Sequence, residues 1–306
     1  VGLFLQVVSA GNRDIQVRRC DFENFYDPSY TFATTDTVMQ SFQYRIYFSA
    51  GIWVGGNLLS EVQAATLLDG YTVEDCTFTH CAVGLGMNWY YPPFHAERIR
   101  NVTFANLRFR DLLMNGIELR QTIGAVVRDV VIENSALAPA DDPLPLHADF
   151  GVAGLFFHGV QDLELTGIDI REVHRGDSPD GCGIDFEYCR RVTLRDSQVR
   201  NCDVSAILFL DTPPGMPLTP GFSREIRIEN CLFERNRVRV YTIPNVDIDF
   251  DFYSRNPRNE VAFVGCTIRA LDPDRVLNVT NPSFITFTDC TIEALPEGES
   301  QGEPSP

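Results

Sequence analysis

One eight-residue pattern recurs along almost the whole chain and restricts the fold more than any other feature. In most copies, apolar residues occupy the first, third and eighth positions, and a polar and then a small residue fill the fifth and sixth. The copies are IQVRRCDF (15–22), YTVEDCTF (71–78), VTFANLRF (102–109), VVIENSAL (130–137), LELTGIDI (163–170), VTLRDSQV (192–199), IRIENCLF (226–233), VAFVGCTI (261–268) and ITFTDCTI (285–292). Alternation with a period of two is typical of β-strands that bury one face.

The spacing of the copies indicates how these strands are arranged. Apart from one double-length gap near the start, successive copies lie 24 to 35 residues apart. Periods of this size, built from strands, favour a solenoid of β-coils with loops of variable length. Five cysteines share the sixth position, and Ser135 and Ser197 align with them; the cysteines are Cys20, Cys76, Cys231, Cys266 and Cys290. We expect these residues to stack as a ladder of small buried side chains.

A second type of strand follows the first in most repeats and starts with a small residue. Its copies are AGIWVG (50–55), VGLGMN (83–88), NGIELR (115–120), AGLFFH (153–158), CGIDFE (182–187) and SAILFL (205–210). Two or three short strands per turn predict an all-β fold: a single-stranded right-handed parallel β-helix of about nine to ten coils. We expect one such domain over residues 1–293. The remaining residues, 294–306, are rich in Pro, Glu, Ser and Gly, which predicts a disordered tail.

These repeats resemble the pectin-lyase-like superfamily, which includes pectate lyases and polygalacturonases. The resemblance spans residues 1–293 and implies a β-helix that acts on carbohydrate. Residues 178–197 look like the N-T-D-G-I-D signature of polygalacturonases, with Asp185 as the aspartate of G-I-D. The catalytic aspartate of N-T-D falls at Cys182, and the G-H-G and R-I-K motifs of that family are absent. The polygalacturonase mechanism therefore does not carry over; only Asp185 matches, at a supporting position.

The outward-facing residues of the second strand type predict two parallel files of side chains. The first file is Trp53, Gly86, Glu118, Phe156, Asp185 and Leu208; the second is Gly55, Asn88, Arg120, His158, Glu187 and Leu210. Neighbouring coils lie about 4.8 Å apart, and residues i and i+2 of one strand about 6.6–7 Å apart. Five ionisable side chains on three consecutive coils therefore form one patch about 10 Å long, and we interpret it as the candidate catalytic site. An ordinary surface network of neutralised charges is the alternative.

Aromatic residues flank this patch and suggest a surface for sugar rings. The segment NWYYPPFH (88–95) contains Asn88, Trp89 and Tyr90, while Trp53 and Phe156 lie on the first file itself. We predict that these five residues bind substrate, because sugars stack their apolar faces on aromatic rings. A loop that merely packs against the coils is the alternative for the 88–95 segment.

Two carboxyl groups on one face suit a glycoside hydrolase acting on a neutral or weakly charged glycan. One carboxylic acid protonates the leaving oxygen and the other serves as nucleophile or base. We assign Glu187 as the acid, because neighbouring His158 and Leu210 should leave it poorly hydrated and raise its pKa. Asp185 is then the nucleophile or base, with Glu118 as an alternative partner, and Arg120 and His158 orient substrate hydroxyls.

Two other functions remain open at this point. A polysaccharide lyase would use Arg120 or His158 as its base, usually with calcium and a basic groove. A non-catalytic β-helix, such as a glycan-binding tail spike or adhesin, would use the same aromatic residues without needing the carboxyl pair.

Charge and composition exclude several classes of chemistry. The net charge is −17 and the chain contains no lysine, so all 25 basic residues are arginines. Lysine Schiff bases and phosphate-loop lysines are therefore excluded, and binding of nucleic acid or of an anionic membrane is disfavoured. A polyanionic substrate would be repelled unless metal ions or a local arginine cluster intervene.

Metal sites have little support in the sequence. Asp247, Asp249 and Asp251 alternate within VDIDFDFY (246–253) and offer hard oxygen ligands of the kind that calcium prefers. Their spacing of about 7 Å on one strand is too wide for all three to share one ion. We therefore expect no metal and no other cofactor, with calcium as the alternative.

The chain holds no run of about 18 apolar residues that would form a membrane-spanning helix. It starts at Val1 within a strand-like segment, without a signal peptide, and this resembles a fragment or a mature form. A carbohydrate substrate would suit a secreted or cell-surface protein.

Overall fold

A computed structural model describes the chain at residues 2–7, 12–25, 50–56, 68–87, 99–135, 153–174, 181–209, 223–236, 242–243, 246–247, 252–254, 260–270, 273–279 and 285–295. Within these residues the structure is made of β-strands, apart from one 3₁₀ helix at Pro273–Arg275. No helix in this part of the chain has the length and apolar character needed to cross a membrane.

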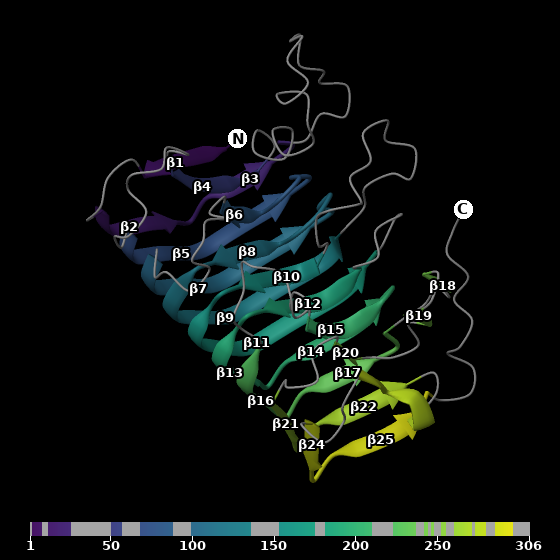
Figure 1. Cartoon of the computed structure of the whole chain (residues 1–306). Helices are drawn as coiled ribbons and strands as arrows, with labels where there is room; N and C mark the ends of the chain where they lie inside the picture. Colours follow the sequence, from purple (N-terminus) through teal and green to yellow (C-terminus); the bar gives the residue numbers. More distant parts are fainter. Residues whose placement is uncertain are drawn as a thin grey trace.

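Two large sheets run side by side along the molecule (Figure 1). The nine strands of sheet A are, in spatial order, β1 (Leu3–Val7), β4 (Ile52–Gly56), β6 (Leu85–Met87), β8 (Ile117–Arg120), β10 (Ala153–His158), β12 (Cys182–Glu187), β15 (Ser205–Phe209), β20 (Phe252–Ser254) and β23 (Leu277–Val279). Each strand pairs in parallel with the next. The chain therefore returns to sheet A once per coil.

Sheet B contains the strands of the eight-residue repeat. Its main path is β2 (Asn12–Arg18), β5 (Leu68–Thr79), β7 (Ile99–Arg110), β9 (Thr122–Ser135), β11 (Gln161–Val173), β13 (Arg190–Arg195), β16 (Arg224–Glu229), β21 (Val261–Val264) and β24 (Ile285–Thr288). The branch strands are β3 (Asp21–Glu23), β14 (Gln198–Cys202), β17 (Leu232–Glu234), β22 (Thr267–Ala270) and β25 (Thr291–Ala294). All of these pairs are parallel. The predicted solenoid of parallel β-coils is confirmed.

The fifth position of the repeat is where each coil bends within sheet B. Residues in this column have a positive φ, which places them in the left-handed region: Arg19, Asp75, Asn106, Asp129, Gly167, Asp196, Asn230, Gly265 and Asp289. Asn, Asp and Gly adopt this region at the lowest cost, which explains why they fill most of the column. Side chains also join neighbouring coils here, since Asn106 Nδ2 donates to Asp75 Oδ1 at 2.6 Å.

The cysteine ladder forms with one correction. Cys76, Cys231 and Cys266 are buried free thiols, whereas Cys20 and Cys290, on the first and last coils, are half-buried. Sheet register places Cys76, Leu107, Val130, Ile168, Ser197, Cys231, Cys266 and Cys290 in one column. The alignment of Ser135 with these cysteines is wrong, because Ser135 pairs with Val173, which in turn pairs with Cys202 at the next bend.

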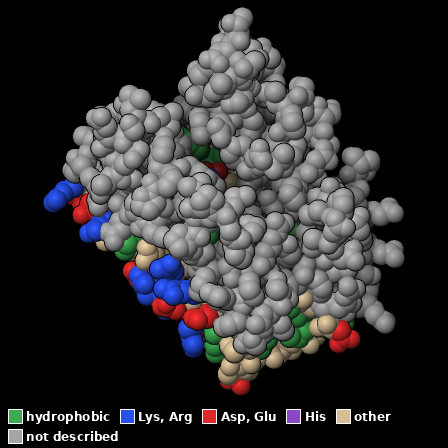
Figure 2. All heavy atoms as spheres, in the orientation of Figure 1, with side chains coloured by type: hydrophobic (Ala, Val, Ile, Leu, Met, Phe, Trp, Pro, Cys, Tyr) green, Lys and Arg blue, Asp and Glu red, His purple; other side chains and the backbone are tan. Residues whose placement is uncertain are grey.

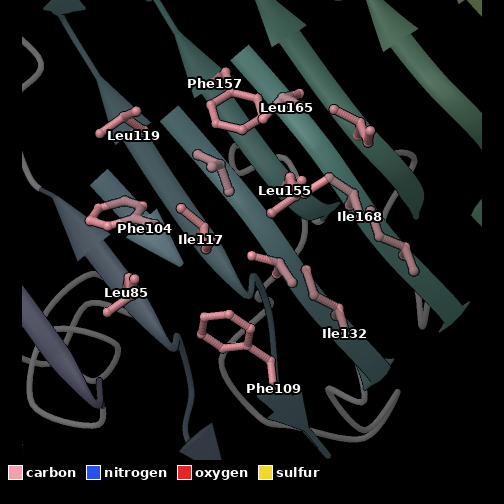
Figure 3. Close-up of a cluster of buried hydrophobic side chains, with 14 of the residues drawn as sticks. Leu85, Phe104, Phe109, Ile117, Leu119, Ile132, Leu155, Phe157, Leu165 and Ile168 are labelled. Atoms are coloured by element: carbon pink, nitrogen blue, oxygen red, sulfur yellow. The ribbon is translucent and has the colours of Figure 1, made fainter. Parts of the chain in front are cut away.

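Apolar side chains from the two sheets meet between them and form the core. The rings of Phe78 and Phe109 are stacked at 4.8 Å, and Phe157 and Phe186 at 5.6 Å, so that aromatic residues run from coil to coil. Figure 3 shows part of this core, with Phe109 and other labelled side chains pointing into the space that strands of neighbouring coils enclose. All four rings are 1% exposed or less.

Glycine lies next to the first residue of several strands of sheet A, because the coils approach too closely there for a side chain. The column is Gly51, Gly84, Gly116, Gly154 and Gly183, with Ala206 next. A methyl group at Gly84 would lie 2.3 Å from the ring of Phe109 and 2.6 Å from the carbonyl oxygen of Gly116. The small residue that marks the second strand type is therefore a steric requirement.

We predict that Gly84→Ala lowers the free energy of unfolding by about 1–3 kcal/mol, because the clashing carbonyl belongs to the backbone of the next coil. Chemical denaturation measures this change. As a matched control, Ala206→Gly in the same column should cost no more than about 1 kcal/mol. An equal or smaller loss for Gly84→Ala would contradict the steric explanation.

One predicted strand is divided. Within VDIDFDFY, Val246–Asp247 forms β19 and pairs antiparallel with β18 (Thr242–Ile243), whereas β20 starts at Phe252 and joins sheet A. Asp249 and Asp251 lie outside the described residues. The last strand, β25, ends at Ala294, one residue beyond the expected domain boundary, and the expected tail from 296 onwards also lies outside them.

Candidate active site

The outer face of sheet A brings the five predicted ionisable residues together. Register pairs Phe156 with Glu118 and His158 with Arg120, and on the other side Phe156 with Asp185 and His158 with Glu187. The two predicted files therefore exist on β8, β10 and β12. Local sequence explains this placement, because the alternate residues of each strand are core leucines, isoleucines and phenylalanines that point inward.

His158 and Glu187 form a close pair across neighbouring coils. His158 Nδ1 lies 2.5 Å from Glu187 Oε2, and the imidazole is 2% exposed. When Nδ1 carries the ring proton, this N–H donates a hydrogen bond to the Glu187 carboxylate. The pair thus orients the ring and selects its tautomer, as carboxylate–histidine pairs do in many catalytic sites.

Arg120 lies between an aromatic ring and a carboxyl group. Its guanidinium carbon is 4.7 Å from the centroid of the Phe156 ring, which is a cation–π distance. Its NH2 nitrogen lies 3.8 Å from Glu118 Oε2. All three residues are buried, so the positive charge of Arg120 acts on the patch with little screening by solvent.

Glu118 is held by a residue that sequence reasoning missed. Asn115 Nδ2 donates a hydrogen bond to Glu118 Oε1 at 2.7 Å, and Asn115 Oδ1 accepts one from the backbone N–H of Ala153 at 2.8 Å. Burial raises the pKa of Glu118, and this effect outweighs the opposing influence of Arg120 and the Asn115 hydrogen bond. The signal was present in NGIELR, where an amide residue stands in the place of the Ala, Val, Cys or Ser of other copies.

The three carboxyl groups differ in burial, and the order is not the one expected. Asp185 is fully buried and the Glu118 side chain is 7% exposed, whereas that of Glu187 is 12% exposed and is the most accessible of the three. The premise that Glu187 is the least hydrated carboxyl is therefore wrong. Burial raises the pKa of Glu118, which makes this residue a candidate for the general acid.

The predicted aromatic residues are only partly placed by the structure. Trp53 and Phe156 lie on the first file but are 2% and 4% exposed. The Trp53 ring lies against the backbone of Gly86, where a methyl group would come within 2.1 Å of it. Phe156 packs with Ala153, Cys182 and Leu208 in a small apolar cluster outside the main core. Asn88, Trp89 and Tyr90 lie outside the described residues, so their predicted contact with substrate stays a prediction.

Figure 2 shows a recess near the position that β6 and β8 occupy in Figure 1, with hydrophobic and acidic side chains visible inside it. Within the described residues, no group of three or more His, Cys, Asp or Glu side chains is arranged to hold a metal ion.

Comparison with known proteins supports the fold. No family model matches the chain, and neither does any curated protein. The structure is similar to a GH136 lacto-N-biosidase from Eubacterium ramulus at a TM-score of 0.51, with 13% identity over 95% of this chain; the chain spans 45% of that protein. It also matches an alginate lyase from Paenibacillus sp. str. FPU-7, with a TM-score of 0.47 and 13% identity over 81% of this chain and 75% of that one. Identities this low establish a shared fold for the first and carry no assignment of activity.

Proposed function

We propose that this protein is a carbohydrate-active enzyme, a glycoside hydrolase that cleaves a neutral or weakly charged glycan with two carboxyl groups. The observation that carries the proposal is Glu118, whose pKa burial raises, on the same file of side chains as a second carboxyl group, Asp185. Two carboxyl groups held in different environments are what acid–base hydrolysis of a glycosidic bond requires. The similarity in fold to a lacto-N-biosidase agrees with this class of substrate.

In the proposed mechanism Glu118 is the general acid and Asp185 the general base. Glu118 gives its proton to the leaving glycosidic oxygen as the bond to the anomeric carbon breaks. Asp185 takes a proton from the water that attacks the anomeric carbon from the opposite face. The two residues stand two strands apart on one file, separated by Phe156. Two strand spacings are about 9–10 Å, which favours an inverting reaction over a retaining one.

The remaining polar residues position the substrate. Glu187 holds the His158 ring through Nδ1 and so fixes the imidazole within the patch. Arg120, whose guanidinium lies over the Phe156 ring, donates hydrogen bonds to sugar oxygens. The patch contains three carboxyl groups against one arginine and one histidine. Its net charge therefore disfavours a uronic acid at the cleavage point.

A second function is favoured by one specific contact. The His158–Glu187 pair resembles a base held by a carboxylate, and such a base could remove the proton next to a uronate carboxyl group in a lyase reaction. That reaction ends in a conjugated unsaturated sugar, whereas hydrolysis ends in two saturated sugars. The products therefore separate the two proposals.

The test incubates the purified protein with panels of neutral and uronic-acid glycans and measures both new reducing ends and ultraviolet absorbance. We expect reducing ends without absorbance on a neutral glycan, and a loss of at least about 100-fold in Asp185→Asn. Glu187→Gln should lose less, because Glu187 acts through His158. Absorbance that disappears in His158→Gln would favour the lyase instead. Tight glycan binding without cleavage on either panel would exclude both.

A further inference from the structure

Cysteines of neighbouring coils stand side by side near both ends of the described solenoid. Sheet register places Cys20 beside Cys76 in the first coils, and Cys231, Cys266 and Cys290 one after another in the last three. In the middle coils the same column is filled by Leu107, Val130, Ile168 and Ser197. Within the described residues, an outermost coil has a neighbour on one side only. The cysteines therefore meet where the coils have the fewest contacts to hold them.

The backbone holds Cys266 and Cys290 at the spacing of a disulfide. Cys266 lies at the bend between β21 and β22, and Cys290 at the same bend of the next coil, between β24 and β25. Directly paired residues of parallel strands lie about 4.8 Å apart, within the range of about 4.4–6.8 Å that separates the Cα atoms of a disulfide. The backbone N–H of Cys266 donates to Cys290 Sγ at 3.4 Å, so this sulfur already lies towards its neighbour.

The two side chains also have matching orientations. Cys266 Sγ lies 3.5 Å from the carbonyl oxygen of Val264, two residues earlier in the chain. Cys290 Sγ lies 3.4 Å from the carbonyl oxygen of Thr288, again two residues earlier. Both thiols therefore project from the same side of their coils, as a disulfide between these coils requires.

The thiols of the last three coils differ in their access to solvent. Cys290 is half-buried, whereas Cys266 is 1% exposed and Cys231, on its other side, is 2% exposed. A dissolved oxidant can therefore reach the sulfur of Cys290 directly, while the two inner thiols are shielded by the coils around them. Oxidation at this end of the solenoid should begin at Cys290 and continue to its neighbour in register.

The surroundings of Cys266 suit a thiol that completes a disulfide. A hydrogen bond from the thiol of Cys231 lowers the pKa of Cys266, although burial opposes this change. The thiolate is the form of cysteine that attacks a sulfur atom of another disulfide. At the other end of the solenoid, burial raises the pKa of Cys76, the inner partner of Cys20, so that pair lacks the same advantage.

We propose that Cys266 and Cys290 form an oxidation site, where a small dissolved disulfide such as oxidised glutathione converts them into a disulfide that joins the last two described coils. Cys290 attacks one sulfur of oxidised glutathione, which releases one glutathione thiol and leaves a mixed disulfide. Cys266 then attacks the Cys290 sulfur and releases the second glutathione thiol. The protein loses two electrons and two protons, and oxidised glutathione gains both. The site is independent of the proposed hydrolase activity, because it lies outside the carboxyl patch.

Peptide mapping by mass spectrometry tests the site on the full chain. The reduced, folded protein is incubated with oxidised glutathione, the remaining thiols are alkylated, and the chain is cut with trypsin, which cleaves between the two cysteines at Arg269 and Arg275. We expect two peptides joined through Cys266 and Cys290. In Cys266→Ser, glutathione should remain attached to Cys290, because the thiol that displaces it is missing. In Cys290→Ser, both Cys231 and Cys266 should be recovered as free thiols.

Serine is a suitable replacement in this column. Ser197 occupies the column in an inner coil, where it is buried and its Oγ donates to the carbonyl of Arg195 at 2.7 Å. Cys20→Ser is the matched control, because it removes another half-buried thiol at the opposite end of the solenoid. That variant should still form the disulfide between Cys266 and Cys290.

Stability gives a second measurement that does not depend on peptide mapping. In the Cys20→Ser background, oxidation should shift the midpoint of urea denaturation to a higher concentration, because the disulfide restricts the unfolded chain. Adding Cys290→Ser should abolish this shift. The proposal would be overturned if Cys290 stayed reduced in the wild type, if it kept glutathione without joining Cys266, or if the joined peptides appeared only after urea had unfolded the chain. A disulfide between Cys231 and Cys266 instead would overturn it as well.

Discussion

Glu118→Gln should reduce the turnover number of the enzyme by about 10²–10⁴-fold, the usual contribution of a positioned general acid. Glutamine keeps the shape of the side chain and can still contact Asn115 and Arg120, but it has no proton to give to the leaving oxygen. Substrate affinity should change little, because the proton is transferred only in the transition state. Steady-state kinetics on the glycan found active in the panel separates kcat from KM.

The pH profile gives a second, independent reading of Glu118. Because burial raises its pKa, the carboxyl stays protonated to a higher pH than an exposed glutamate, and activity should fall as pH rises through that raised pKa. This fall in activity at high pH should be absent from the residual activity of Glu118→Gln. Asn115→Ala removes a hydrogen-bond donor that favours the ionised form of Glu118. The fall in activity should therefore occur at a higher pH, and kcat should also be lower.

The stability of Glu118→Gln provides a control for its loss of activity. A glutamate whose pKa is raised by folding stabilises the protein fully below its unfolded pKa, and this contribution is lost as pH rises through the folded pKa. Above that pH, Glu118→Gln should therefore unfold at the same or a higher denaturant concentration than the wild type. Lost activity together with lost stability at neutral pH would instead indicate a structural role for Glu118.

Phe109→Ala should lower the free energy of unfolding by about 3–5 kcal/mol, the cost of removing a buried aromatic ring and leaving a cavity. Phe109 is 1% exposed and stacks on Phe78 at 4.8 Å, and it also packs against the backbone of Gly84. It is the last ring of the stack that begins at Phe22, and the residue beside it on the next coil is Ile132. Chemical denaturation followed by circular dichroism measures the change.

Phe287→Ala is the matched control for this prediction. Phe287 stacks on Phe263 at 4.9 Å in a similar geometry, but it belongs to the last described coil and is only half-buried. Its removal exposes less new apolar surface and should cost clearly less. Equal losses in the two variants would mean that the stability of the solenoid does not depend on burial in its middle coils.

Much of the fold could be predicted because every coil of a solenoid repeats the same short-range sequence pattern. Strand alternation, a left-handed residue at each bend and glycine at the close approach of coils all leave short-range marks in the sequence. The same reasoning predicted which residues of successive coils stand beside one another, including Arg120, His158 and Glu187. In-register parallel pairing turns a sequence alignment of the coils directly into spatial neighbours.

The alignment of Ser135 shows where a local pattern is not enough. The long strand β9 has a positive φ at Gly124 and also at two non-glycine residues, Asp129 and Asn134. Each of the two is an Asn or Asp within apolar residues. The eight-residue repeat can therefore be aligned with either Asp129 or Asn134 at its fifth position. Pairing with β7 and β11 selects the frame, which only the neighbouring coils can reveal.

By itself, the sequence determined the parallel solenoid and the two files that carry Glu118, Arg120, His158, Asp185 and Glu187, because both follow from a two-residue period repeated coil after coil. The tertiary structure alone decided how deeply each carboxyl group is buried and that Asn115 holds Glu118. Burial depends on everything packed around a side chain, not just on its neighbours in the file. For that reason Glu118, clamped by Asn115, replaces Glu187 as the proposed acid.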